Sequence, residues 1–126
     1  MQTRYLMTGS AAAMALAGLA LQFAPHEMLV AVGVAATAGA AAAAQVTGGL
    51  YLGFAMLNWM SKGARIGGIY GRPLAMANLV HFVAGALALM KHAANGASLL
   101  LWGVTVLYAT LAAAFTFVTF THPREL

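Results

Sequence analysis

The chain has 126 residues, of which 63% are hydrophobic and only 6% are charged, whereas an ordinary soluble domain carries about 25% charged residues. This composition excludes a typical water-soluble protein and predicts an integral membrane protein whose surface is covered by lipid. The formal net charge of +4 does not indicate a nucleic-acid partner, because the cations are scattered at the ends of apolar segments and form no patch with aromatic residues.

A membrane-spanning helix needs about 20 mainly apolar residues. Four segments meet this requirement, at about 5–24, 36–60, 74–90 and 98–120, with an inner loop at 61–73. We therefore predict an all-α fold, a transmembrane four-helix bundle that forms a single domain over residues 1–126. The first segment also resembles a signal peptide, since Arg4 precedes an apolar run with small residues, but we expect it to remain as a spanning helix.

The stretch after the first segment is too long for one span. A single helix over residues 25–62 would be on the order of 50 Å long, and the hydrocarbon core is about 30 Å thick. We predict a short interfacial helix that begins at Pro25 and ends near Gly33, with Glu27 placed favourably for the helix dipole. The alternative is one continuous bent helix.

Small and polar residues recur at four-residue spacing in the second segment. Gly49 and Gly53 form a GxxxG pair, and Ala41 and Gln45 extend the same stripe. Such stripes allow close helix packing in lipid, so we expect this face to pack against another helix, either of this chain or of a second copy. We expect Asn58, near the inner end of this segment, to reach the lipid headgroups.

Cations flank the spans unevenly. With four spans, one side of the membrane carries Arg4, Lys62, Arg65, Arg72 and Arg124, and the other side carries only Lys91. Because Lys and Arg are enriched in cytoplasmic loops, we predict a multi-pass protein of the bacterial inner membrane with both termini in the cytoplasm. The glycine-rich loop that holds Lys62, Arg65 and Arg72 is expected to be flexible. It either sets only the orientation of the protein in the membrane or also binds anionic lipid or a partner protein.

Polar residues inside the membrane are expected to have a role. In the third segment, Asn78, His81 and Gly85 share one helix face. In the fourth, a second face is predicted to look inward: Thr105, Tyr108, Ala112, Thr116 and Thr119. We consider two interpretations of a polar site formed by Asn78, His81, Gln45, Thr105 and Tyr108. In the first, His81 forms a hydrogen bond with a Thr, Tyr or Gln of a neighbouring helix and only stabilises the bundle. In the second, these residues line a cavity for a substrate, a quinone or a proton.

Cofactor chemistry has little basis in the sequence. Haem ligation by two histidines needs a second histidine at the depth of His81, and the other three lie near the ends of the spans. His26, Glu27 and His92 are weak candidates for a metal site, without the spacing of a known motif. The absence of cysteine excludes thiolate ligands and disulfides. We expect no metal, haem or quinone.

One resemblance follows from these elements. The residues Phe23-Ala24-Pro25-His26-Glu27, the run Gly48 to Phe54, the pair Asn58-Trp59 and a third span led by Arg72 resemble small bacterial four-helix membrane proteins of the DoxX-like type. The resemblance implies a four-helix bundle with an accessory role in a membrane complex.

Three classes of function are compatible with these sequence features. We favour a non-enzymatic accessory or scaffold subunit that packs against other membrane subunits or copies of itself. The alternative is a small oligomeric transporter or channel with its site around Asn78 and His81, although the first span lacks the glutamate on which the small multidrug resistance family depends. An enzyme or a cofactor-binding redox subunit is least expected, because acid–base catalysis normally needs two positioned titratable groups and the predicted spans bury only His81.

Overall fold

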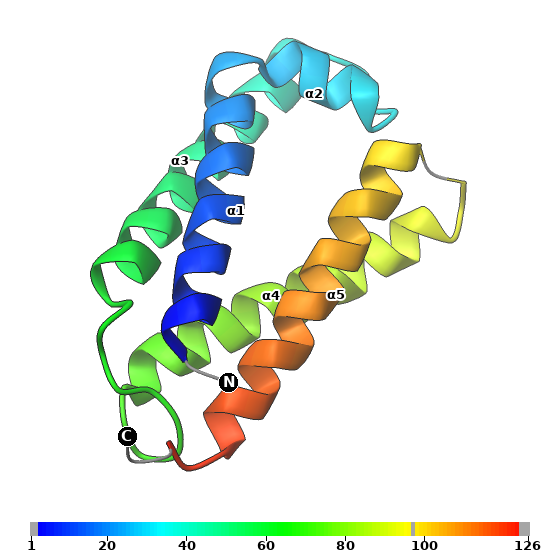
Figure 1. Cartoon of the computed structure of the whole chain (residues 1–126). Coiled ribbons are helices and arrows are strands. Elements are labelled where there is room, and N and C mark those ends of the chain that lie inside the picture. The colour runs from blue at the N-terminus through cyan, green and yellow to red at the C-terminus, as the bar shows by residue number, and fades with distance from the viewer. Residues whose placement is uncertain (1–2, 97, 124–126) are drawn as a thin grey trace. The chain divides into compact units, whose positions relative to one another are not determined.

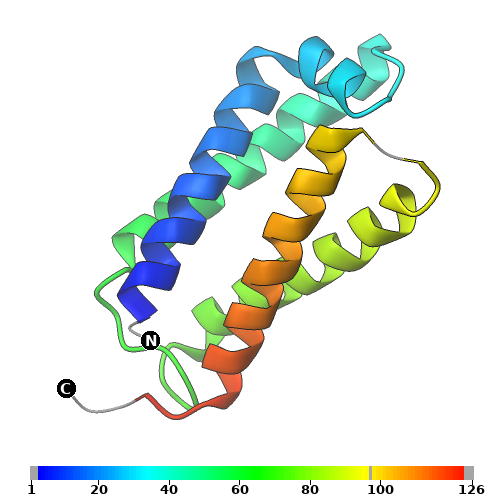
Figure 2. The ribbon, with the colours of Figure 1, turned by 45° about the vertical axis from the view of Figure 1, so that its right-hand side comes forward.

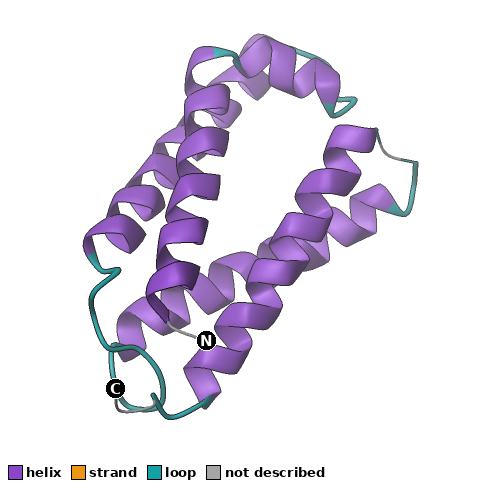
Figure 3. Ribbon diagram, viewed as in Figure 1, coloured by secondary structure: helices purple, strands orange, loops and turns teal. Residues whose placement is uncertain are grey.

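The computed structural model describes residues 3–96 and 98–123, and this part of the chain folds into helices joined by short loops (Figures 1 and 3). The five helices are α1 (Thr3–Phe23), α2 (Pro25–Ala31), α3 (Ala38–Met60), α4 (Arg72–Ala93) and α5 (Leu99–Phe120). The predicted all-α fold class, with four spanning helices and a short helix between the first two spans, is confirmed.

Four of these helices are long and apolar enough to cross a membrane: α1, α3, α4 and α5. They contain 21, 23, 22 and 22 residues, and an α-helix of about 21 residues is ~32 Å long. Their ends lie close to the predicted ends of the spans, and the largest difference is at the end of α4, which continues to Ala93. The protein is therefore a multi-pass integral membrane protein.

The chain between α1 and α3 is broken at Gly33. The N–H of Gly33 donates to the carbonyl of Val30 at 3.0 Å, and the N–H of Val34 donates to the carbonyl of Leu29 at 2.8 Å. These two bonds, with φ of +81° at Gly33, form a Schellman motif that ends α2. The next helix, α3, begins at Ala38 and is capped by Thr37, whose hydroxyl accepts from the N–H of Ala40 at 3.1 Å. The alternative of one bent helix is therefore wrong.

The described chain divides into two compact units. One runs from Met7 to Lys62, and the other holds the residues from Gly63 onward together with the start of α1 up to Leu6. In the first unit, α1 and α3 run side by side in opposite directions (Figures 1 and 2), and α2 contacts α3. The prediction of a single domain stays a prediction.

In the second unit, α4 and α5 form a helical hairpin (Figure 2). Its buried centre contains Phe82 of α4 and Phe115 of α5, whose rings stack with their centroids 5.5 Å apart and their planes inclined by 8°. The side chains of both residues are fully buried. This buried ring pair is therefore a central packing contact between α4 and α5.

Candidate functional site

His81 and Tyr108 join α4 to α5 near the middle of both helices. The Nε2 atom of His81 lies 3.0 Å from the hydroxyl oxygen of Tyr108 and shares a hydrogen bond with it. The ring of Phe82 lies edge-on to both, at centroid distances of 4.9 Å and 5.2 Å. The predicted pairing of His81 with a polar residue of a neighbouring helix is thus present in this geometry.

A glycine on α4 makes this contact possible. A Cβ atom at Gly85 would lie 2.5 Å from Cε1 and 2.7 Å from Cδ1 of the Tyr108 ring. Tyr108 is 95% buried, since its exposed fraction is 5%, so its ring has little room to move away. Gly85 therefore lets the ring lie against the backbone of α4, where its hydroxyl reaches His81.

The other members of the predicted polar site donate hydrogen bonds to backbone carbonyl groups. Asn78 donates to the carbonyl of Leu74 at 3.0 Å, and Thr105 donates to the carbonyl of Leu101 at 2.7 Å. Both side chains are buried. Gln45 lies in the unit of α1 and α3, where its Nε2 donates to the carbonyl of Gln22 at 3.2 Å.

The predicted inner face of α5 is mostly correct. Thr105, Tyr108, Ala112 and Thr119 are buried, whereas Thr116 is exposed and donates to the carbonyl of Ala112 at 2.7 Å. A threonine that bonds its own backbone in this way loses no hydrogen bond when it faces lipid. Thr116 can therefore lie outside the packed face of α5.

The glycines that bring α1 and α3 together are not those of the predicted stripe. A Cβ atom at Gly48 would lie 2.9 Å from the carbonyl oxygen of Gly18, and one at Gly18 would lie 2.9 Å from the carbonyl oxygen of Gly48. Among the described residues, nothing lies within 4 Å of a Cβ atom built at Gly49 or Gly53. Ala41 is buried, while Gln45, Gly49 and Gly53 are exposed.

A buried polar pair also links α1 and α3. Asn58 donates to the hydroxyl oxygen of Ser10 at 3.0 Å, and both side chains are fully buried. The expectation that Asn58 reaches the headgroups is therefore wrong. The sequence signal was present, because Asn58 lies ten residues after Gly48 and three after Ala55 on the buried face of α3.

The inner loop is folded rather than flexible. Gly67 and Tyr70 exchange two backbone hydrogen bonds of 2.9 Å and 3.0 Å, and Ile66 is 1% exposed. A Cβ atom at Gly67 would lie 2.6 Å from the carbonyl oxygen of Thr121, so the loop packs on the end of α5. The prediction of a flexible loop missed the anchoring role of Ile66.

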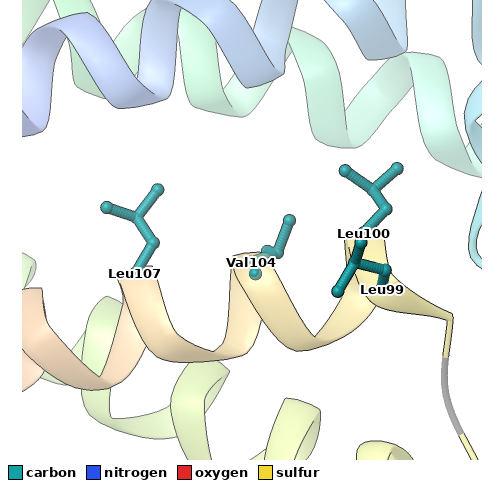
Figure 4. Close-up of a pocket in the computed structure, with 5 residues that line it drawn as sticks. Leu99, Leu100, Val104 and Leu107 are labelled. Carbon is teal, nitrogen blue, oxygen red and sulfur yellow. The ribbon is translucent and has the colours of Figure 1, made fainter.

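A depression of about 480 Å³ lies along the first half of α5 (Figure 4). Leu100, Val104 and Leu107 project from the same side of the helix there (Figure 4), and Leu99 and Gly103 complete the lining. None of the predicted polar residues lines this depression. With only apolar side chains, it suits an acyl chain or an apolar side chain and offers no group to orient a polar substrate.

In the described part of the chain, no group of three or more His, Cys, Asp or Glu side chains is arranged to hold a metal ion. The weak metal hypothesis for His26, Glu27 and His92 thus gains no support. Comparison of the chain with protein-family models, with curated proteins and with solved structures gave no match.

Proposed function

We propose that this protein is a non-enzymatic accessory subunit of the bacterial inner membrane, which packs against other membrane chains or copies of itself. The observation that carries the proposal is the use of polar side chains as internal connections. Among the described residues, every buried side-chain nitrogen and oxygen atom has a hydrogen-bond partner. His81 with Tyr108 and Asn58 with Ser10 each tie two helices together, as interhelical polar pairs do in membrane bundles.

The surface offered to a partner is the exposed stripe of α3. Gly49 and Gly53 are open positions, with nothing described within 4 Å of an added Cβ atom. A stripe of small residues that faces outward lets another helix approach closely. Gln45, one turn before Gly49, adds a polar side chain on the same face.

The orientation in the membrane is part of the proposal. Three cations lie between the end of α3 and the start of α4, namely Lys62, Arg65 and Arg72, and Lys91 lies in the last turn of α4, at the other end of that helix. The positive-inside rule then favours cytoplasmic termini and a cytoplasmic inner loop. The DoxX-like resemblance supports the same accessory role.

Isolation of the protein from native membranes in a mild detergent, followed by native mass spectrometry, tests this function. We expect the wild-type chain to copurify in a complex with other chains or with further copies of itself. The double variant Gly49→Leu/Gly53→Leu should keep its helical content but should no longer bind these partner chains, because leucine fills the space that a partner helix needs. The matched control is Gly9→Leu/Gly39→Leu, since both glycines are also helical and open. A wild-type chain that is always a lone monomer contradicts the proposal.

The second candidate is a transporter, and the hydrogen bond between His81 and Tyr108 favours it because a histidine within a span is a candidate proton carrier. It predicts that purified protein in liposomes moves protons or a solute, and that His81→Ala abolishes this flux. Flux that is absent, or that is unchanged in His81→Ala, removes this candidate.

A further inference from the structure

Three basic side chains surround one four-residue turn of the inner loop. The turn runs from Gly67 to Tyr70, which exchange backbone hydrogen bonds, and its two central residues are Gly68 and Ile69. It connects the end of α3 to the start of α4. Because both helices are long enough to span the membrane, the turn lies at the membrane surface, at the level of the lipid headgroups.

Each basic group is held against this turn by a specific contact. The guanidinium of Arg65 lies over the ring of Tyr70, 5.0 Å from its centroid. The Nη1 atom of Arg72 donates to the carbonyl of Gly68 at 3.3 Å. The ring of His122 lies 5.8 Å from that of Tyr70, and its Nδ1 atom would be 3.2 Å from a Cβ atom at Gly68. We call Arg65, Tyr70, Arg72 and His122 the basic turn cluster.

The positive charge of this cluster is not neutralised within the described structure. Of the two acidic residues, Glu27 lies in α2 and Glu125 lies outside the described residues. The described contacts of Arg65 and Arg72 are to an aromatic ring and a carbonyl oxygen rather than to a carboxylate. Both arginines are exposed. A guanidinium presents several N–H donors in one plane, so a single contact to Gly68 leaves Arg72 with N–H groups for another acceptor.

The cluster also has an apolar side. Ile69, at the tip of the turn, is 75% exposed, and Tyr70 is 37% exposed. Tyrosine is enriched where the headgroups meet the acyl chains. A ligand that brings an anion and an acyl chain together would therefore satisfy both the arginines and the exposed apolar tip.

We propose that the basic turn cluster is a binding site for the headgroup of an anionic phospholipid, with Arg65 and Arg72 on the phosphodiester and Ile69 among the acyl chains. Arginine suits this role because its planar fork matches phosphate oxygens in pairs, whereas lysine acts as a point charge. The fixed turn matters because it holds both guanidinium groups in place before the lipid arrives. Such a site would serve an accessory subunit or a transporter equally well.

Native mass spectrometry of the full chain, released from nanodiscs with equal amounts of phosphatidylglycerol and phosphatidylcholine, tests the proposal. We expect the wild type to retain phosphatidylglycerol preferentially. Arg65→Gln and Arg72→Gln should each reduce this preference more than about fivefold, because diffuse attraction at a membrane surface contributes ~1 kcal/mol per cation and the paired N–H contacts of arginine add to it. Lys91→Gln, which removes one charge from the end of α4, should leave the preference unchanged.

The double variant Arg65→Lys/Arg72→Lys separates a built site from diffuse attraction, because it keeps the charge and removes the planar forks. We expect it to lose most of the preference, with helical content and melting temperature as folding controls. The proposal is overturned if the wild type shows no preference, if this lysine variant matches the wild type, or if Lys91→Gln loses as much as Arg72→Gln. The proposal is also overturned if inorganic phosphate alone raises the melting temperature of the wild type as much as phosphatidylglycerol does.

Discussion

Tyr108 fits against α4 because residue 85 has no side chain. The ring occupies the space of the missing Cβ atom, and the hydroxyl then falls 3.0 Å from His81. Ring packing and the hydrogen bond therefore contribute separately to the stability of the contact between α4 and α5. Two substitutions can measure them independently.

We predict that Gly85→Ala destabilises the protein more than Tyr108→Phe. The added methyl group would overlap the buried ring, and overpacking of this kind costs about 1–3 kcal/mol. Tyr108→Phe keeps the ring and removes the interhelical hydrogen bond to His81, and such a bond is worth about 0.6 kcal/mol in a membrane protein. Unfolding equilibria in mixed micelles measure both free energies. A larger cost for Tyr108→Phe would show that the hydrogen bond, not the close packing, holds α4 to α5.

The sequence was informative about which residues matter at this scale, but less so about their partners. The face of Asn78, His81 and Gly85 was visible from spacing alone, and tyrosine was among the partners expected for His81. The partner of Asn58 was not visible, because Ser10 lies 48 residues away in the chain and only the packing of α1 on α3 brings the two together.

Among the helices, α1 and α3 approach each other closely at Gly18 and Gly48. The predicted stripe through Gly49 is one residue away, which on an α-helix is a rotation of about 100°. A pair of adjacent glycines does not tell which of the two faces the neighbouring helix. The breaks around α2, by contrast, were readable from Pro25 and Gly33, because both residues have strong backbone preferences.

The two adjacent glycines provide a matched test of this packing. We predict that Gly48→Leu lowers the free energy of unfolding by about 1–3 kcal/mol or more, because its side chain would meet the backbone of α1 at Gly18 and Gln22. Gly49→Leu should leave the stability equal or slightly higher, since leucine is a better helix former than glycine by up to about 1 kcal/mol. Melting temperatures in detergent compare the two variants. Equal destabilisation by both would contradict the observed register of α3.

At the scale of the whole molecule, the composition predicted membrane insertion and the number of spans, because a hydrocarbon core of fixed thickness sets the length of each helix. The folding of the inner loop escaped prediction. Its order depends on one buried isoleucine, on glycines with positive φ and on contact with the end of α5, which lies about 50 residues further along the chain.

We propose that lipid surrounds the four spans and that the inner loop faces the cytoplasm. Since the chain has no cysteine, single cysteines report their own accessibility. Ala64 in the inner loop and Ala94 at the end of α4 are both exposed. In intact cells, a membrane-impermeant maleimide should label Ala94→Cys and should label Ala64→Cys only after the membrane is opened. Labelling of Ala64→Cys from outside, or recovery of the protein in the soluble fraction without detergent, would contradict the account.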